Sequence, residues 1–243
     1  MEYLFEGAIA CKAAILAQNR EVYEVLIDNK RKDRDCAFIK RIATQNNIPI
    51  TLLSREEIDA LASKTTHGGI LCKCGERRYQ TLEEIIKTNG FTVILEGIED
   101  PYNFAYILRS LYALGCHGVI VPERNWTTAS DVIAKGSAGA SEYIPIVSVS
   151  DMGEAIATLK QHGITLLGAM RSDSAIPLYE ADLTGGICIA IGGEMRGLSK
   201  VVENEVDTQV YIPYEGDFRN ALTAASSGAI LAYEVARQRM NKK

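Results

Sequence analysis

Between Phe91 and Ile212, short apolar segments alternate with segments of helical spacing. The segments predicted as strands cover residues 91–95, 117–121, 143–149, 164–169, 187–191 and 207–212. They are nearly continuous runs of apolar residues and lack the polar alternation of half-exposed strands. Such strands fit a parallel sheet that helices cover on both faces. Helices are expected at residues 101–114, about 128–136, 151–161, 198–204 and about 219–239.

The first 88 residues are interpreted as a smaller α/β unit. Helical spacing at residues 7–18 and 36–46 alternates with predicted strands at residues 22–27, 48–53 and 70–73. Two capping boxes, one starting at Ser54 and one at Thr81, predict further short helices. We place the boundary near Asn89, which gives two domains, residues 1–88 and 89–243.

The composition excludes several classes of protein. The chain has 243 residues, of which 47% are hydrophobic and 23% charged, as in ordinary globular proteins. No apolar run reaches the ~18 residues that a membrane helix needs, and the N-terminus lacks the basic start of a signal peptide. We therefore expect a cytoplasmic protein without membrane contact. More than half of the lysines and arginines lie in residues 1–88, so this part is the better partner for a polyanion.

The six cysteines fit a reducing compartment as free thiols. Cys72 and Cys74 form a CxC motif, which differs from the CxxC of zinc ribbons. His67 is nearby, but no second pair of ligands follows at a usable spacing. We therefore expect buried thiols and no metal site.

The stretch Phe91–Gly115 joins an apolar strand to a helix that carries an amide and a guanidinium. Asp100 can cap this helix, and Pro101 suits its first position. Asn103 lies in the first turn, and Arg109 follows less than two turns later. An amide and a permanent cation near a helix N-terminus suit an anionic ligand such as a phosphate of a nucleic acid. A plain strand–helix unit with a solvated Arg109 is the alternative.

A second stretch, Ile187–Ser199, ends a predicted strand at Gly192 and Gly193 and reaches a helix after Gly197. Glycines at the carboxyl end of a sheet let backbone amides approach a ligand. The spacing is neither GxGxxG nor a phosphate-binding P-loop, which disfavours a nicotinamide-dependent oxidoreductase. A glycine-rich turn without a ligand is the simpler interpretation of this stretch alone.

A third stretch, Val210–Ala225, ends a strand at Ile212 and Pro213 and continues through Gly216 into the last predicted helix. The first turns expected for this helix consist almost entirely of small residues. A helix start without bulky side chains lets a ligand or a second chain approach its backbone. Dense packing within one subunit would explain the same pattern.

In order along the chain, the three stretches resemble the signature motifs of the SpoU family of RNA ribose 2′-O-methyltransferases, within the SPOUT superfamily. The matching residues are Asp100, Pro101, Asn103 and Arg109, then Gly192, Glu194, Gly197 and Leu198, then Ile212, Pro213 and Gly216. The resemblance covers residues 91 to about 236. Residues 1–88 more loosely resemble the substrate-binding domain that often precedes this family's catalytic domain, with His67-Gly68-Gly69 in place of His-Gln-Gly.

The resemblance implies an α/β fold in which a small ribosomal-protein-like substrate-binding domain precedes a trefoil-knot (SPOUT) methyltransferase domain. It also implies S-adenosylmethionine as the cofactor, rRNA or tRNA as the substrate, and a homodimer. The cofactor would lie at strand ends and in the third motif. The cofactor-binding residues implied in this way are Leu166, Gly168, Ile191, Gly192, Gly193, Met195, Gly197, Ile212, Pro213, Tyr214, Asn220, Ala221 and Leu222.

For catalysis, the resemblance points to Arg109, Asn103 and Glu194. The reaction moves a methyl group from a sulfonium to a ribose 2′-oxygen, which must be positioned and must lose its proton. A guanidinium is always protonated in proteins, which makes Arg109 a poor base. We expect Arg109 to hold a neighbouring phosphate and to stabilise the developing alkoxide, while Glu194 orients Arg109 or Asn103.

Two departures from the family pattern bear on activity. Ala105 stands where the family usually has glycine. The Ser-Leu-Asn of the third motif is replaced by Asn220-Ala221-Leu222 or Ala221-Leu222-Thr223, depending on register. The alternative function is therefore a non-catalytic RNA-binding protein with a degenerate methyltransferase site.

Three residues outside the motifs have weaker assignments. Arg171, in a polar loop, is a dimer contact or an RNA contact. Trp126 stacks on a base or packs on its own domain, and His67 is more simply a turn residue than an RNA contact.

Overall fold

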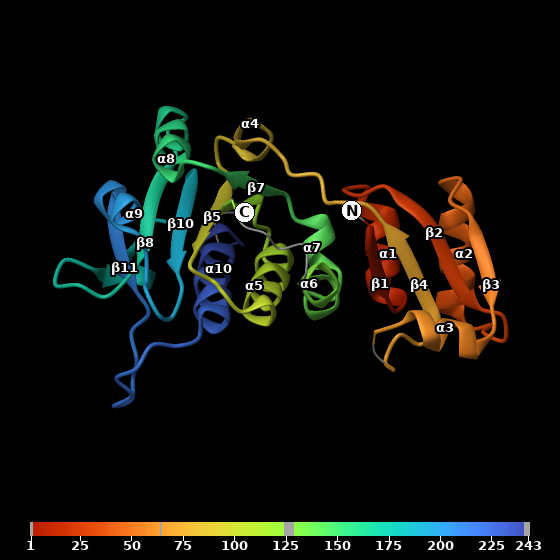
Figure 1. Cartoon of the computed structure of the whole chain (residues 1–243). Helices are drawn as coiled ribbons and strands as arrows, with labels where there is room; N and C mark the ends of the chain where they lie inside the picture. Colours follow the sequence, from red (N-terminus) through yellow and green to blue (C-terminus); the bar gives the residue numbers. More distant parts are fainter. Residues whose placement is uncertain (1, 64, 124–128, 241–243) are drawn as a thin grey trace. The chain divides into compact units, whose positions relative to one another are not determined.

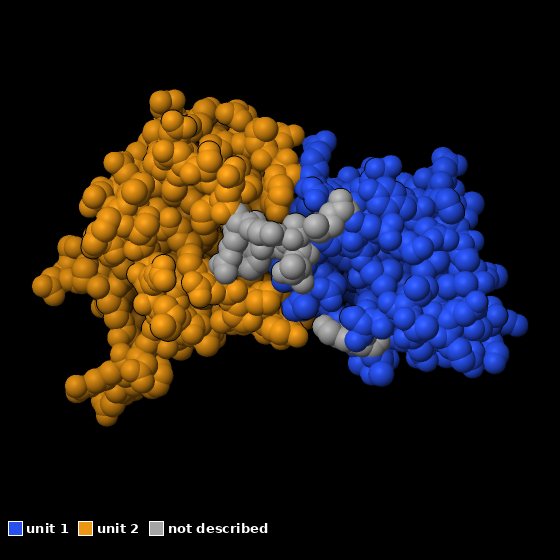
Figure 2. All heavy atoms as spheres, in the orientation of Figure 1, with its two compact units in different colours: residues 1–78, 125–143 blue, residues 79–124, 144–243 orange. Residues whose placement is uncertain are grey.

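The computed structural model describes residues 2–63, 65–123 and 129–240. The chain forms two compact units (Figure 2). Met1–Arg78 and Asn125–Tyr143 make the first, and Tyr79–Arg124 and Ile144–Lys243 make the second. Among the described residues, no helix is both long and apolar enough to cross a membrane.

The first unit contains a four-stranded mixed sheet. Its order is β1 (Tyr3–Glu6), β4 (Ile70–Cys74), β2 (Val22–Asp28) and β3 (Ile50–Leu53). Strand β4 is antiparallel to both neighbours, whereas β2 and β3 are parallel. Helices α1 (Ala8–Ala17) and α2 (Arg34–Gln45) pack on one face. Helix α3 (Arg55–Leu61) packs on the other through the buried Ile58.

Two helices from the later part of the chain complete the first unit. They are α6 (Ser130–Gly136) and α7 (Ala140–Tyr143). Gly139 between them has φ +82, and a Cβ atom there would lie 2.6 Å from Cβ of Ala13, so this contact requires glycine. Glu142 is buried and pairs with Arg20 at 2.9 Å. Arg77 also pairs with Glu142, at 3.6 Å, so removing Glu142 would leave two buried guanidinium groups without their acid. These ion pairs tie α7 to this unit.

The second unit is built on a seven-stranded parallel sheet (Figure 1). In spatial order its strands are β7 (Ile146–Val149), β6 (Gly118–Pro122), β5 (Phe91–Glu96), β10 (Ile187–Gly192), β8 (Thr165–Ala169), β11 (Thr208–Tyr211) and β9 (Ile176–Pro177). Every pairing in it is parallel. Because β10 lies between β5 and β8, segments far apart in sequence end side by side at the carboxyl edge.

Helices cover both faces of this sheet, as the sequence predicts. Helices α5 (Pro101–Ala113) and α10 (Ala224–Met240) pack together on one face, where Gly228 approaches Ile107 and Ile191. The other face carries α4 (Leu82–Ile85), α8 (Met152–Gln161) and α9 (Lys200–Glu205), whose apolar side chains share a buried cluster with the strands. A short 3₁₀ helix, Leu178–Glu180, follows β9.

Most predicted elements are confirmed within a few residues, including the capping boxes at Ser54 and Thr81. Two boundaries are wrong. The strand predicted to begin at residue 143 begins at Ile146, because Ala140–Tyr143 form α7. The last helix begins at Ala224 rather than near residue 219, because Thr223 accepts a hydrogen bond from the backbone of Ser226 and so acts as its cap. The sequence patterns do not predict strands β1 and β9.

Candidate functional site

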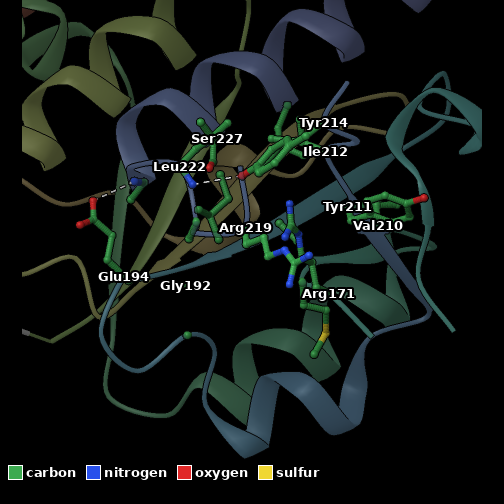
Figure 3. Close-up of a pocket in the computed structure, with 18 residues that line it drawn as sticks. Arg171, Gly192, Glu194, Val210, Tyr211, Ile212, Tyr214, Arg219, Leu222 and Ser227 are labelled. Carbon is green, nitrogen blue, oxygen red and sulfur yellow. Dashed lines mark hydrogen bonds between the residues drawn. The ribbon is translucent and has the colours of Figure 1, made fainter. Parts of the chain in front are cut away.

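A cavity of about 330 Å³ lies at the carboxyl ends of β8, β10 and β11, beside the start of α10 (Figure 3). Residues from the second and third predicted motifs make most of its wall. Those predicted from the sequence are Glu194 and the cofactor-binding residues Ile191, Gly192, Gly193, Gly197, Ile212, Tyr214, Ala221 and Leu222. Strand ends that are far apart in sequence therefore share one cavity.

Two glycines at the end of β10 allow backbone segments to approach closely. A Cβ atom at Gly192 would lie 2.3 Å from the carbonyl carbon of Gly197. A Cβ atom at Gly193 would lie 2.0 Å from the carbonyl oxygen of Gly97, in the loop that leads to α5. Real Cβ atoms do not come so close, so both positions require glycine. The first and second motifs thus meet through backbone contact.

Glu194 connects the three predicted motifs. Its Oε1 atom accepts a hydrogen bond of 3.3 Å from the amide of Asn103 and one of 3.1 Å from the backbone N–H of Ala224. Asp100 caps α5 by accepting from the backbone of Tyr102 and Asn103. A second cavity of about 150 Å³ lies beside this connection and is lined by Asn103, Gly193, Glu194 and Met195, among others.

The loop between β11 and α10 is held by Tyr214. The backbone N–H of Leu222 donates to the Tyr214 hydroxyl at 3.2 Å (Figure 3). The guanidinium of Arg171 lies over the Tyr214 ring, 4.3 Å from its centroid. The first contact closes the loop, and the second holds it against the segment that follows β8.

Some predicted site residues do not line either cavity. Leu166 and Gly168 are buried inside β8, and the larger cavity is reached by the last residue of this strand, Ala169, and by the two residues that follow it, Met170 and Arg171. Pro213 and Asn220 are exposed and do not line either of the two described cavities. Met195 lines the smaller cavity only, and it is 90% exposed. The cofactor-binding role of all of these residues stays a prediction.

Arg109 is placed apart from both described cavities. It is exposed on the surface of α5, on the side that also carries the exposed Tyr102 and Tyr106. Its guanidinium forms no hydrogen bond or ion pair with another described residue. Its catalytic role therefore stays a prediction.

Sequence reasoning missed several residues of the larger cavity. Met170 and Arg171 line it directly after β8, and Arg219 and Ser227 line it from the loop and from α10. The rule that ligands bind at the carboxyl ends of parallel strands would have found the first two, because they follow a predicted strand. No comparable signal marked Arg219, which was expected to start a helix.

The histidines and cysteines do not line the larger cavity. His67 is buried, with Nε2 2.9 Å from Asp59 and Nδ1 accepting from Gly69. Burial lowers the pKa of His117, and the positive charge of Lys87 acts in the same direction. All six cysteines are free and buried, and the described residues contain no group of three metal-ligating side chains. Trp126 lies outside the described residues.

Residues 90–233 match the model described as the SpoU rRNA Methylase family, and residues 4–80 match the one described as RNA 2′-O ribose methyltransferase substrate binding. The chain belongs to the SpoU family. It is 28% identical to the 23S rRNA (guanosine-2′-O-)-methyltransferase RlmB of Xanthomonas campestris, over 96% of each chain. It is 27% identical to RlmB of Pseudomonas putida, over 98% of this chain and 97% of the relative.

Solved structures with this fold extend the comparison. The SpoU methyltransferase AviRb of Streptomyces viridochromogenes, in complex with AdoMet, has a TM-score of 0.81 and 23% identity over 98% of this chain and 91% of that chain. The TrmH/SpoU tRNA modifying enzyme of A. aeolicus has a TM-score of 0.56 and 22% identity over 66% of this chain and 80% of that chain. The comparisons confirm the predicted SpoU family and the predicted α/β fold class. The chain is a methyltransferase.

Proposed function

We propose that this SpoU protein transfers a methyl group from S-adenosylmethionine to a ribose 2′-hydroxyl of rRNA or tRNA. One observation carries the proposal. The carboxyl ends of β8, β10 and β11 share a cavity with the start of α10, and the hydrogen bond from Asn103 to Glu194 connects that cavity to the first motif. RlmB relatives, named as 23S rRNA (guanosine-2′-O-)-methyltransferases, support the same reaction.

The residues of the larger cavity fit the proposed cofactor. Ile191, Ile212, Leu222 and Leu231 offer apolar side chains to a purine ring. Gly192 and Gly193 line the cavity without side chains, so a ribose or an amino-acid tail would meet their backbone. When bound, S-adenosylmethionine supplies an electrophilic methyl group on a sulfonium. The volume of about 330 Å³ is within the range of ordinary small-molecule sites.

The described contacts favour a positioning role for Glu194 towards Asn103, one of the two roles expected from the sequence. Glu194 accepts from Asn103 and from the start of α10, so it fixes the amide relative to the cavity wall. Asn103 would then hold the ribose or its phosphate by hydrogen bonds. Arg109 would hold a phosphate and stabilise the developing alkoxide, while phosphate or water takes the proton.

A homodimer would bring Arg109 to a cavity. Arg109 does not line the described cavities of its own chain, and a second copy of the chain packed against α5 would carry it to the cavity of its partner. The same face of α5 exposes Tyr102 and Tyr106, which are 48% and 47% exposed, and α10 exposes Tyr233 at 57%. Exposed aromatic side chains on neighbouring helices are typical of a subunit interface.

The remaining parts of the proposal concern organisation. Residues 1–88 would select the RNA and residues 89–243 would perform the chemistry, in line with the substrate-binding match at residues 4–80. The insertion of β10 between β5 and β8, and of β11 between β8 and β9, supports the expected trefoil knot. Six free thiols support a cytoplasmic location.

Calorimetry with S-adenosylmethionine tests the proposal. We expect binding that is saturable and that Leu222→Trp abolishes, because a larger side chain would fill the cavity. If the wild-type protein binds RNA but shows no heat of binding at high micromolar S-adenosylmethionine, the alternative function, RNA binding without catalysis, replaces the proposed one.

A further inference from the structure

Two arginines and two aromatic residues gather where the larger cavity meets the solvent. We call Arg171, Tyr214, Phe218 and Arg219 the rim. Arg171 follows β8, and the other three belong to the loop between β11 and α10. Arg171, Tyr214 and Arg219 line the cavity, and both arginines are exposed (Figure 3). The rim therefore combines residues from two separate segments at one opening.

The rim is held in a defined arrangement. The Tyr214 hydroxyl accepts from the backbone of Leu222, which closes the loop. The guanidinium of Arg171 stacks on the Tyr214 ring at 4.3 Å, and the ring of Phe218 lies 6.2 Å from that of Tyr214. Phe218 is nevertheless 56% exposed. The loop thus presents an aromatic ring to solvent beside two guanidinium groups.

The charges of the rim lack an anionic partner within the described residues. Neither Arg171 nor Arg219 forms a side-chain hydrogen bond or an ion pair with a described residue. Two positive charges on one cavity wall repel each other, and an anionic ligand would remove that cost. S-adenosylmethionine carries two positive charges and one negative charge, so it matches this pair poorly. Phosphate oxygens match guanidinium groups in charge and geometry.

We propose that the rim binds single-stranded RNA at the nucleotide to be methylated. Phe218 stacks on an unpaired base, and Arg171 and Arg219 hold the adjoining phosphates, the combination that single-stranded nucleic acids favour. The inference rests on the proposed function. It adds a second RNA contact, located on the methyltransferase domain, to the contact expected from residues 1–88.

Fluorescence anisotropy with a labelled, short single-stranded RNA of mixed sequence tests the inference. Titrations at several salt concentrations compare the wild-type protein with the double variant Arg171→Gln/Arg219→Gln. The variant should lower the slope of log affinity against log salt by about 1.4, the value for two phosphate contacts to a single strand. Lys160→Gln is the control for the loss of a positive charge outside the rim. Lys160 lies at the end of α8, where it pairs with the partly exposed Glu205 and Asp207.

The aromatic part of the rim has its own pair of variants. Phe218→Leu keeps an apolar side chain without a π-face and should weaken RNA binding about tenfold, whereas Phe218→Trp should preserve it. The affinity of the two Phe218 variants for S-adenosylhomocysteine, measured by calorimetry, should stay within twofold of the wild-type value, about 0.4 kcal/mol, because Phe218 does not line the larger cavity. Thermal unfolding confirms that each variant is folded.

Three results would overturn the inference. The first is an RNA affinity and salt slope of the rim variants equal to those of Lys160→Gln. The second is a loss of S-adenosylhomocysteine binding with unchanged RNA binding, which would assign the arginines to the carboxylate of the cofactor. The third is a change of oligomeric state in Phe218→Leu, which would place the ring against a second copy.

The experiments separate the failure of this inference from the failure of the proposed function. If the wild-type protein binds S-adenosylhomocysteine and methylates RNA, and the rim variants bind RNA as the wild type does, the role of the rim alone is refuted. If the wild-type protein binds RNA through the rim but does not bind S-adenosylhomocysteine, the methyltransferase proposal alone is refuted.

Discussion

The side-chain amide of Asn103 donates a hydrogen bond of 3.3 Å to Oε1 of Glu194, which lies 91 residues further along the chain. The same oxygen accepts from the backbone of Ala224 at the start of α10. One carboxylate therefore joins the helix that follows β5, the turn that follows β10 and the helix that follows β11. This connection makes Glu194 a positioning residue. Its removal should lower both the stability of the protein and the rate of methyl transfer.

Glu194→Ala should lower the free energy of unfolding by about 1 kcal/mol, because α10 loses an acceptor at its N-terminus. It should also reduce the rate of methyl transfer at saturating cofactor by more than tenfold, since Asn103 is no longer held. Glu194→Gln keeps an acceptor oxygen and should retain the stability. Urea unfolding and single-turnover methylation measure the two effects. An alanine variant with wild-type rate and stability would contradict the positioning role.

Gly193→Ala should disrupt the contact between the first and second motifs. The new Cβ atom would lie 2.0 Å from the carbonyl oxygen of Gly97, so one of the two backbones must move. We expect a loss of about 1–3 kcal/mol of stability, as for other overpacked sites, together with weaker cofactor binding. Gly185→Ala is the matched control, because a Cβ atom there meets nothing within 4 Å. Thermal unfolding of both variants checks the prediction, and equal midpoints would refute it.

His117 should make the stability of the second unit depend on pH. Its Nδ1 atom accepts from the backbone N–H of Phe91 at 3.1 Å, and burial lowers its pKa below the ordinary 6.5. The unfolded chain therefore binds more protons than the folded chain between the lowered pKa and 6.5. The contribution of the neutral imidazole is complete above about pH 6.5 and is lost as the pH falls towards the folded-state value.

His117→Gln retains an acceptor but does not titrate, so it should remove this part of the pH dependence. Denaturant midpoints of the wild-type and variant proteins, measured on both sides of pH 6.5, give the comparison. Parallel profiles for the two proteins would show that His117 does not contribute.

The proposed dimer makes a prediction about mixed subunits. Arg109→Ala and Leu222→Trp should each inactivate the homodimer, the first through RNA and the second through the cofactor. A heterodimer of the two variants, purified through two different tags, retains one complete site if Arg109 acts in the cavity of the other subunit. It should therefore show about half of the wild-type activity, as a two-fold symmetric dimer requires. A heterodimer as inactive as its parents would assign Arg109 to its own subunit.

The sequence predicts the parts of this structure that depend on local chemistry. The apolar run of β5, the cap at Asp100 and the capping box at Ser54 follow from neighbouring residues, and each is confirmed. The sequence analysis explains Gly192 and Gly193 by the approach of a ligand, whereas the structure shows that their missing side chains make room for the backbone of Gly197 and Gly97. Their ligand-binding role stays a prediction.

The sequence could not predict features that depend on distant residues. The loop before α10 is closed by the Tyr214 hydroxyl, so residues 219–223 are not helical despite their helix-compatible composition. The assignment of α7 to the first unit depends on Glu142 and Arg20, which are 122 residues apart. The position of Arg171 against Tyr214 follows from the order of β8 and β11 in the sheet, which local patterns do not encode.

Transfer of a labelled methyl group from S-adenosylmethionine to RNA tests the central claim most directly. The substrate is total RNA from cells that lack this protein, and ribose 2′-O-methyl marks are mapped before and after incubation with wild-type protein and Leu222→Trp. We predict new 2′-O-methyl marks with the wild-type protein and none with the variant. RNA without any new mark, or with label on a base instead of a ribose, would contradict the account.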